Sequence, residues 1–332
     1  MKYRKVGKSG LKISEISLGS WLTYGGTVEN EIAKKCMTTA IEHGINFIDS
    51  AEIYAKGEAE KVIAEFLAEE TINRKDLVIS SKVFWPMSED INRWGLSRKN
   101  IKNAIEGTLE RLNVDYIDIY YMHRYDYMTP LKETVEVLDD LIHDGKILYW
   151  GTSVWTAAQL ERANAVAKEL KAHKPIVERP MYNMFNRFIE LEIMSVAKTH
   201  GMGFTVWSPL GQGLLTGKYN KGIPEGSRGS RSESIKKYLT QENLSKLEKL
   251  GEIASSLEIT TSQLALAWIL RKPEISAAII GATKPEHVIE NVKASDIILS
   301  KDTLEQIEDV LDNEPEWPLT YKPNKYYIEK MR

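Results

Sequence analysis

Four side chains that follow short apolar segments are the ones in this sequence best suited to chemistry. Asp49, Lys82 and His123 each stand where such a segment ends, and Tyr54 follows Asp49 by five residues. A tyrosine is a weak acid with an ordinary pKa of about 10, and a nearby ammonium group, such as that of Lys82, lowers this pKa. Asp49 can keep Lys82 charged and in place, and His123 can donate a hydrogen bond to a carbonyl oxygen. Together the four groups are suited to protonating an oxygen on which negative charge develops.

Each of the four residues has an ordinary structural interpretation when it is taken alone. An aspartate before a loop is most often a cap or turn former, and a lysine at a strand end is usually a solvated charge. His123 fits a hydrogen-bonded structural role, and Tyr54 fits an aromatic packing role in a loop. Their coincidence at the ends of neighbouring segments favours a common catalytic site. With one histidine there and no zinc-type Cys/His spacing in the sequence, we expect no metal.

The elements that must position these residues alternate along the chain as apolar segment, loop and amphipathic helix. A hairpin over residues 2–16, with its turn at 7–10, precedes eight such units. This alternation predicts a parallel sheet, and eight units in 332 residues favour a closed (β/α)8 TIM barrel over a doubly wound sheet. We expect the strands at 16–19, 46–50, 77–83, 116–123, 148–153, 176–180, 204–208 and 277–281. We expect the helices, which include extra C-terminal ones, at 28–43, 58–70, 97–112, 130–145, 157–170, 190–200, 242–257, 262–270, 285–294 and 301–311.

In barrels of this kind, functional groups lie at the carboxyl ends of the strands and in the loops that follow them. The segments 207–213 and 281–284, after the seventh and eighth strands, contain glycines that let a ligand approach the backbone closely. The helix after the eighth strand offers free N–H groups to a phosphate, and the long loop 211–238 carries Lys218 and Arg228. Glycine-rich basic loops are often merely flexible and solvated, but their position here favours phosphate binding. Because the sequence has no nucleophile elbow, we expect a bound cofactor to supply the reactive group.

The composition is that of an ordinary soluble protein, with 42% hydrophobic and 27% charged residues. We expect a single barrel domain over residues 1–332, with a C-terminal tail from about 313 to 332. A net charge of −3 argues against nucleic acid as a main partner, because phosphate binding needs a basic surplus. The only cysteine, Cys36, permits no intrachain disulfide, and we find neither a signal peptide nor an apolar run of about 20 residues. These features predict a cytoplasmic location.

Several further stretches match a known family. With Asp49, Tyr54, Lys82 and His123, the chain resembles the aldo-keto reductases over nearly its whole length, and in particular the β subunits of voltage-gated potassium channels and their microbial relatives. The matching stretches are Leu18-Gly19-Ser20-Trp21, Gly95-Leu96-Ser97-Arg98-Lys99, Tyr149-Trp150-Gly151-Thr152-Ser153, Trp207-Ser208-Pro209-Leu210 and Gly217-Lys218-Tyr219. The resemblance implies NADPH-dependent reduction of an aldehyde or ketone. The nicotinamide would give a hydride to the carbonyl carbon, and Tyr54 would protonate the oxygen.

The resemblance also implies a set of residues that bind NADPH. The nicotinamide and its ribose would contact Ser20, Trp21, Asp49, Ser153, Arg179 and Trp207. The phosphates and the adenosine would contact Ser208, Leu210, Gly213, Lys218, Arg228, Gly281, Thr283, Glu290 and Asn291. Many reductases have Asn and Gln against the carboxamide where this chain has Val154 and Arg179, which leaves the orientation of the nicotinamide open. His123 stands where the channel subunits have Asn, so the four catalytic residues are complete here and favour a working enzyme.

Two functions are compatible with the sequence. The first is reduction of a small aldehyde or ketone in an aromatic pocket formed by Trp21, Tyr24, Trp85, Trp94, Tyr125 and Trp155. The second is a redox-sensing subunit that binds NADPH and associates with a membrane channel. The resemblance also leaves open a homotetramer, for which the sequence has no feature of its own.

Overall fold

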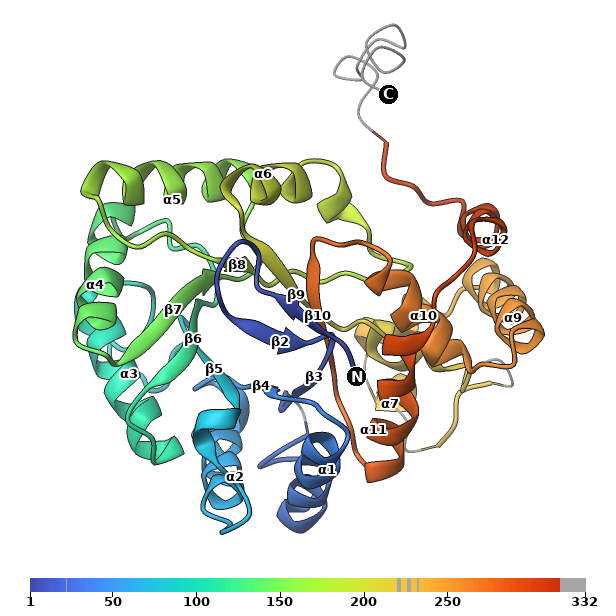
Figure 1. The fold of residues 1–332 in the computed structure, drawn as a ribbon, viewed down its shortest axis with the longest axis horizontal. Coiled ribbons are helices and arrows are strands. Elements are labelled where there is room, and N and C mark those ends of the chain that lie inside the picture. Colours follow the sequence, from blue (N-terminus) through green and yellow to red (C-terminus); the bar gives the residue numbers. More distant parts are fainter. Residues whose placement is uncertain (22, 220–221, 226–227, 232, 317–332) are drawn as a thin grey trace, which may run out of the picture.

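The barrel predicted from the sequence is present in the computed structural model, which describes residues 1–21, 23–219, 222–225, 228–231 and 233–316. Eight parallel strands close into a ring in the order β10-β3-β4-β5-β6-β7-β8-β9, and helices surround this ring (Figure 1). All eight strands overlap the expected segments. They are β3 (Ile16–Gly19), β4 (Phe47–Asp49), β5 (Val78–Val83), β6 (Ile117–Met122), β7 (Ile147–Thr152), β8 (Val177–Glu178), β9 (Gly203–Trp207) and β10 (Ile275–Ile280).

The helices begin where the sequence supplies caps for their free N–H groups. The Ser97 hydroxyl accepts a hydrogen bond from the Asn100 N–H at the start of α3, and Thr156 and Thr260 form capping boxes before α5 and α10. The helices are α1 (Asn30–Glu42), α2 (Glu58–Leu67), α3 (Arg98–Leu112), α4 (Leu131–His143), α5 (Ala157–Leu170), α6 (Ile193–His200), α7 (Arg228–Arg231), α8 (Glu233–Lys236), α9 (Gln241–Ser256), α10 (Thr261–Leu270), α11 (Pro285–Val292) and α12 (Lys301–Leu311).

The segment 211–238, which was expected to be a long loop, contains short helical elements. It includes a 3₁₀ segment at Gly211–Thr216 and the one-turn helices α7 and α8. The side chains of Leu214, Leu215 and Ile235 are buried and attach these turns to the core. A single apolar residue per turn gives no helical period, so the sequence pattern did not indicate them.

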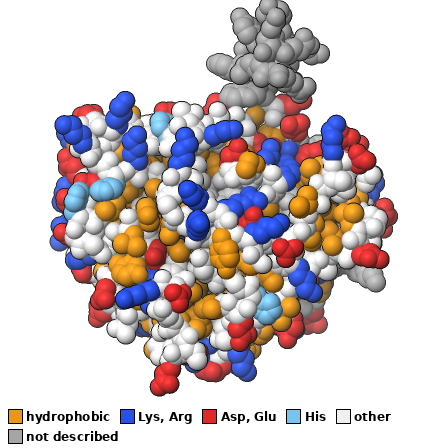
Figure 2. Space-filling model, viewed as in Figure 1, with side chains coloured by type: hydrophobic (Ala, Val, Ile, Leu, Met, Phe, Trp, Pro, Cys, Tyr) orange, Lys and Arg blue, Asp and Glu red, His pale blue; other side chains and the backbone are white. Residues whose placement is uncertain are grey.

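The N-terminal hairpin covers the end of the barrel at which the strands begin. Its strands β1 (Tyr3–Lys5) and β2 (Lys12–Ser14) pair antiparallel and lie across the barrel opening in Figure 1. Figure 2 shows the same face, with Lys and Arg side chains gathered near its centre over the hairpin. The hairpin adds two side chains to the apolar cluster inside the barrel, which comprises Val6, Ile13, Phe47, Val78, Ile119, Tyr121, Val177, Ala277 and Ile279. The barrel interior is therefore a packed core, open to function only at the opposite end.

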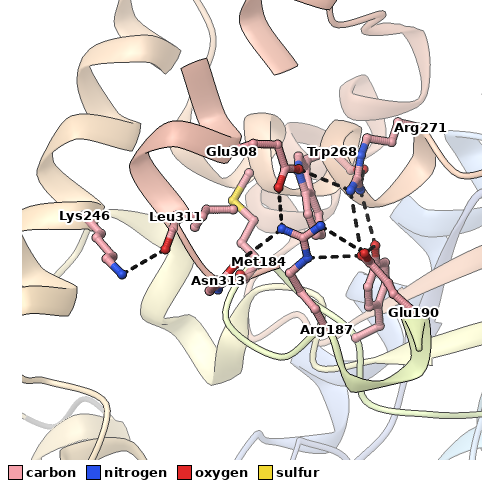
Figure 3. Close-up of polar contacts among 10 residues, drawn as sticks. Met184, Arg187, Glu190, Lys246, Trp268, Arg271, Glu308, Leu311 and Asn313 are labelled. Carbon is pink, nitrogen blue, oxygen red and sulfur yellow. Dashed lines mark hydrogen bonds and ion pairs between the residues drawn. The ribbon is translucent and has the colours of Figure 1, made fainter. Parts of the chain in front are cut away.

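The C-terminal helix α12 is held by a polar cluster in which two arginines contact one tryptophan (Figure 3). The Arg187 guanidinium pairs with Glu190 at 2.9 Å and with Glu308 of α12. Trp268 of α10 donates its indole N–H to Glu308 at 3.1 Å, and the Arg271 guanidinium lies 3.6 Å from the centre of the Trp268 ring. The cluster joins the segment after β8 to α10 and α12. Residues 317–332 of the expected tail lie outside the described residues.

The described residues contain no single helix that is long and apolar enough to cross a membrane. Helices α9 and α10 meet that criterion only as a pair, and the two are bent by 88° relative to each other.

Candidate active site

The alternation of side chains along the strands brings three of the predicted catalytic residues to one end of the barrel. Phe47 of β4 belongs to the apolar cluster inside the barrel, and Asp49 lies two residues further along that strand. Lys82 and His123 likewise lie four residues beyond the interior side chains of β5 and β6. Because successive side chains of a strand point to opposite faces, even separations keep all three on the inner face. They therefore meet at the carboxyl end of the barrel.

The Asp49 carboxylate lies between two cations. Its Oδ1 is 2.9 Å from Lys82 Nζ, and its Oδ2 is 2.6 Å from Arg179 Nη2. The Ser80 hydroxyl also donates to Oδ1, at 2.9 Å, and Lys82 Nζ donates to the backbone oxygen of Ser50. Asp49 and Lys82 are fully buried, so the Asp49 oxygens and Lys82 Nζ are held by protein partners rather than by solvent.

Tyr54 joins this group from the loop after β4. Lys82 Nζ lies 4.8 Å from the centre of the Tyr54 ring, and Arg179 Nη2 lies 3.5 Å from the phenolic oxygen. The imidazole of His123 meets the Tyr54 ring edge-on, with 6.0 Å between the ring centres. Ala55, directly after Tyr54, has a φ of 48°, a conformation that costs a non-glycine residue free energy and is concentrated at functional sites. The structure thus brings the four predicted residues together.

The ionisation of two of these groups differs from the expectation. Burial raises the pKa of Tyr54 to about 12, although the Arg179 guanidinium opposes this shift. Burial and the charge of Arg179 lower the pKa of Lys82 to about 7, although Asp49 opposes that shift. The expectation of a lowered pKa for the phenol is therefore wrong. Asp49 does favour the charged form of Lys82, as expected, but burial outweighs its effect.

Asp49 and His123 have pKa values that favour one form each at neutral pH. Burial alone would raise the pKa of Asp49, but the charges of Arg179 and Lys82 outweigh it and lower that pKa, so the carboxylate is ionised. Burial, together with the charge of Lys82, lowers the pKa of His123 well below its usual value. The imidazole is therefore neutral and can act as a hydrogen-bond donor to a ligand oxygen.

A cavity of about 520 Å³ opens onto Tyr54 and His123. Its lining is Trp21, Tyr24, Gly26, Thr27, Ile53, Tyr54, Ala55, Trp85, His123, Arg124, Arg179 and Trp207. Three of the six predicted pocket aromatics are thus in the lining. The other three are not: the Trp155 side chain is buried and packs on Tyr125 at 4.8 Å, and Trp94 packs on Phe84 at 6.5 Å. These rings fill space between loops instead of facing the cavity.

Three of the six residues predicted to contact the nicotinamide line this cavity: Trp21, Arg179 and Trp207. The rings of Trp21 and Trp207 are perpendicular, with their centres 5.8 Å apart, and both line it. Ser20 and Ser153 are buried, and the Ser153 hydroxyl donates to the backbone oxygen of Arg179 at 3.0 Å. Arg179 lines the cavity, and its guanidinium is directed to Asp49 and Tyr54, an arrangement that the sequence did not indicate.

The residues predicted at the phosphates and adenosine follow β9 and β10, which are neighbours in the barrel. Ser208 has a φ of 51° directly after β9. A Cβ atom at Gly213 would lie 2.7 Å from Lys218 Nζ, so this glycine lets the lysine fold back over the backbone. Arg228 begins α7, and its side chain lies outside the described part of the chain. The same two loops and helix α11 contain Leu210, Gly281, Thr283, Glu290 and Asn291.

Five buried polar atoms along this path have no hydrogen-bond partner within the described part of the chain. They are Tyr24 Oη, His123 Nδ1, Arg179 Nε, Trp207 Nε1 and Asn291 Oδ1. An unsatisfied buried polar atom costs about 1–3 kcal/mol, so such atoms are normally paired with a ligand or water. The path therefore fits a ligand with polar groups along its length, as a nicotinamide dinucleotide has.

The site also contains polar residues that the sequence reasoning missed. Ser80 donates a hydrogen bond to Asp49. Arg124 lines the same cavity as Tyr54 and His123. Ser80 precedes Lys82 by two residues, and the strand period alone would have placed it on the same face. Arg124 directly follows His123, where the strand has ended and the period no longer predicts a direction.

Residues 15–312 match the model of the Aldo/keto reductase family. The chain belongs to the aldo/keto reductase family. Members of this family typically reduce carbonyl groups and generally use NAD(P)H.

Curated relatives within the family cover the whole length of this aldo/keto reductase. A "Probable voltage-gated potassium channel subunit beta" of Arabidopsis thaliana is 42% identical over 329 residues, which are 97% of this chain and 100% of that protein. A protein of the same description from Oryza sativa subsp. japonica is 40% identical with the same coverage. A "Putative voltage-gated potassium channel subunit beta" of Schizosaccharomyces pombe is 41% identical over 94% of both chains.

Proposed function

We propose that this aldo/keto reductase reduces aldehydes or ketones to alcohols with NADPH, and that Tyr54 is the general acid. The observation that carries the proposal is the position of the Tyr54 phenol. It lies at the base of an aromatic cavity, next to the side chains of Lys82, His123 and Arg179. A small carbonyl compound in that cavity would reach a proton donor and a neutral imidazole together.

The proposed reaction adds a hydride to the carbonyl carbon and a proton to its oxygen, giving an alcohol and oxidised cofactor. The bound NADPH would supply the hydride. With a pKa raised to about 12 by burial, Tyr54 is protonated at neutral pH and can give up its proton as negative charge develops on the substrate oxygen. Arg179, whose Nη2 lies 3.5 Å from the phenolic oxygen, would stabilise the phenolate that remains, and the charged form of Lys82 would add to this. His123 would donate a second hydrogen bond to the same oxygen.

The chain's own residues would hold the cofactor along the path described above. Trp207 and Trp21 would bracket the nicotinamide end, and Ser153 would contact the carboxamide. Lys218, Arg228 and Lys284 are the cations that would favour the extra phosphate of NADPH over NADH. The unpaired Asn291 Oδ1 would accept a hydrogen bond at the adenosine end.

Replacement of the general acid tests the proposal. Tyr54→Phe removes one oxygen and keeps the ring, so we expect the protein to fold and to bind NADPH, while kcat for aldehyde reduction falls about 100-fold or more. The measurement is NADPH oxidation in a stopped-flow screen of aldehydes and ketones, repeated with NADH. Equal rates for Tyr54→Phe and the wild type, or no reduction of any carbonyl compound by the wild type, would contradict the proposal.

A second candidate function is a redox-sensing subunit that binds NADPH and associates with a membrane channel. The names of the three curated relatives favour it. If this second function is correct, a channel protein should co-purify with the chain. The activity of that channel should then change with the NADPH/NADP+ ratio in Tyr54→Phe as well as in the wild type. A homotetramer in size-exclusion chromatography would be compatible with either function.

A further inference from the structure

Arg124 has no carboxylate partner within the described part of the chain, unlike many of the arginines there. It is half-buried in the lining of the cavity, directly after His123. Among the described residues, no carboxylate lies within ion-pair distance of its guanidinium, whereas seven other arginines have such a partner. They are Arg4, Arg74, Arg98, Arg111, Arg179, Arg187 and Arg271.

The Arg124 side chain is nevertheless held in one place. Within the described part of the chain its Nη1 donates to the backbone oxygen of His123 at 2.5 Å. Its guanidinium carbon lies 5.5 Å from the centre of the Trp85 ring, within the range of a cation–π interaction. A cation fixed in this way loses little conformational entropy when it binds an anion, because its position is already set.

The surroundings of the cavity carry more positive than negative charge. Arg124 and Arg179 line it, and Lys82 lies behind Tyr54. The Asp49 carboxylate is already shared between Lys82 and Arg179. Glu178 acts on Arg124 only from beyond ion-pair distance. Arg124 thus lacks a direct carboxylate partner among the described residues, in a cavity whose lining has two arginines and no carboxylate, and such a cavity attracts anions.

We propose that Arg124 binds a carboxylate of the substrate, so that the site prefers aldehydes or ketones that carry a carboxylate over their neutral counterparts. The inference rests on the proposed function, since it assigns a substrate class to that same site. A guanidinium binds a carboxylate with two parallel hydrogen bonds, which would also orient the substrate. Trp85 would cover the apolar part of the substrate while its carbonyl oxygen reaches Tyr54.

Matched pairs of substrates test the assignment. We would measure kcat/KM with NADPH for 3- and 4-formylbenzoate and for the corresponding formylbenzamides, which have nearly the same shape and no charge. The wild type should prefer the acid about 10- to 100-fold in at least one pair, the range of a charge-assisted hydrogen bond, with the difference mainly in KM. A ratio within about threefold of one in both pairs would overturn the inference.

Variants assign the preference to Arg124. Arg124→Met should bring the acid-to-amide ratio close to one, and Arg124→Lys should keep part of it because the charge remains. The ratio cancels any loss that affects both substrates, such as a shift of the loop around His123. Arg162→Met, on the exposed surface of α5, is the matched control and should keep the wild-type ratio. An unchanged ratio in Arg124→Met would also overturn the inference.

Failure of the proposed function can be distinguished from failure of this inference. If the wild type reduces the amides and the acids equally well, the proposed carbonyl reduction is supported and the carboxylate-binding role of Arg124 is contradicted. If it reduces neither, the affinities of two product-like compounds are compared instead. The NADP+-loaded protein is titrated with 4-(hydroxymethyl)benzoate and with its amide, and binding is followed by tryptophan fluorescence. Binding of the acid that is about tenfold tighter than that of the amide, and that is lost in Arg124→Met, supports the site. Equal binding of the two compounds contradicts it.

Discussion

Glu52 lies between Asp49 and Tyr54 in the active-site loop, and only 3% of it is exposed. Burial raises the pKa of its carboxyl to about 8, the nearby Glu60 adds to the shift, and Arg111 offsets it in part. The carboxyl of a glutamate in an unfolded chain has a pKa of about 4.5. As pH rises from about 4.5 to 8, the unfolded chain therefore loses this proton first, and folding stability falls across that window.

Glu52→Gln should remove this pH dependence, because glutamine is neutral at every pH and has nearly the same shape. We expect the variant to gain free energy of unfolding relative to the wild type as pH is raised from 5 to 8. Urea unfolding at several pH values measures the difference. Glu58→Gln, an exposed position in the same region, is the control and should show no such trend. A constant difference between Glu52→Gln and the wild type would mean that Glu52 does not titrate in this window.

At the scale of elements, the polar cluster around Trp268 decides how α12 is attached to the barrel. The Arg187 side chain is only 4% exposed, so its charge depends on Glu190 and Glu308 for compensation. Glu308 also accepts the Trp268 indole N–H and lies 3.4 Å from Arg271 (Figure 3). One carboxylate of α12 thus contacts three side chains from other elements.

Glu308→Ala should lower the free energy of unfolding by about 1–3 kcal/mol, because it leaves the Trp268 indole N–H without its acceptor and removes one of the two carboxylates that pair with the buried Arg187. Glu305→Ala is the matched control on the same helix. Its side chain is 65% exposed and pairs only with Lys301, at 3.4 Å, so its replacement should cost at most about 0.5 kcal/mol. Urea unfolding measures both. Equal losses for the two variants would show that the cluster contributes no stability of its own.

At the scale of the whole molecule, the N-terminal hairpin and the barrel meet backbone to backbone. A Cβ atom added at Gly203, the first residue of β9, would lie 2.4 Å from the Gly7 nitrogen and 2.4 Å from the Ser276 hydroxyl. Ser276 in turn donates to the backbone oxygen of Lys5 at 3.0 Å. Only glycine at position 203 lets the hairpin close this end of the barrel.

Gly203→Ala should therefore force the hairpin away from the barrel and lower the free energy of unfolding by about 1–3 kcal/mol. Gly10→Ala, in the same hairpin, places its Cβ in open space and should change stability by less than about 0.5 kcal/mol. Thermal unfolding of the two variants, side by side, gives the comparison. Similar midpoints for both would mean that the hairpin can shift without loss.

The sequence by itself determined the order of the elements and the face on which the predicted catalytic residues lie. Apolar alternation located the eight strands, and the strand period carried Asp49 and Lys82 to the inner face, because both signals depend only on near neighbours in the chain. It did not locate the turns within 211–238, where single buried residues leave no period.

The tertiary structure alone decided the charges of the site. Arg179 pairs with Asp49 across 130 residues, and Arg124 shares a cavity with Trp21 and Trp207 from distant loops. Burial then turned the expected low pKa of Tyr54 into a high one. The sequence could not reveal these features, because the pKa of a group depends on which other segments exclude water from it and which charges they bring beside it.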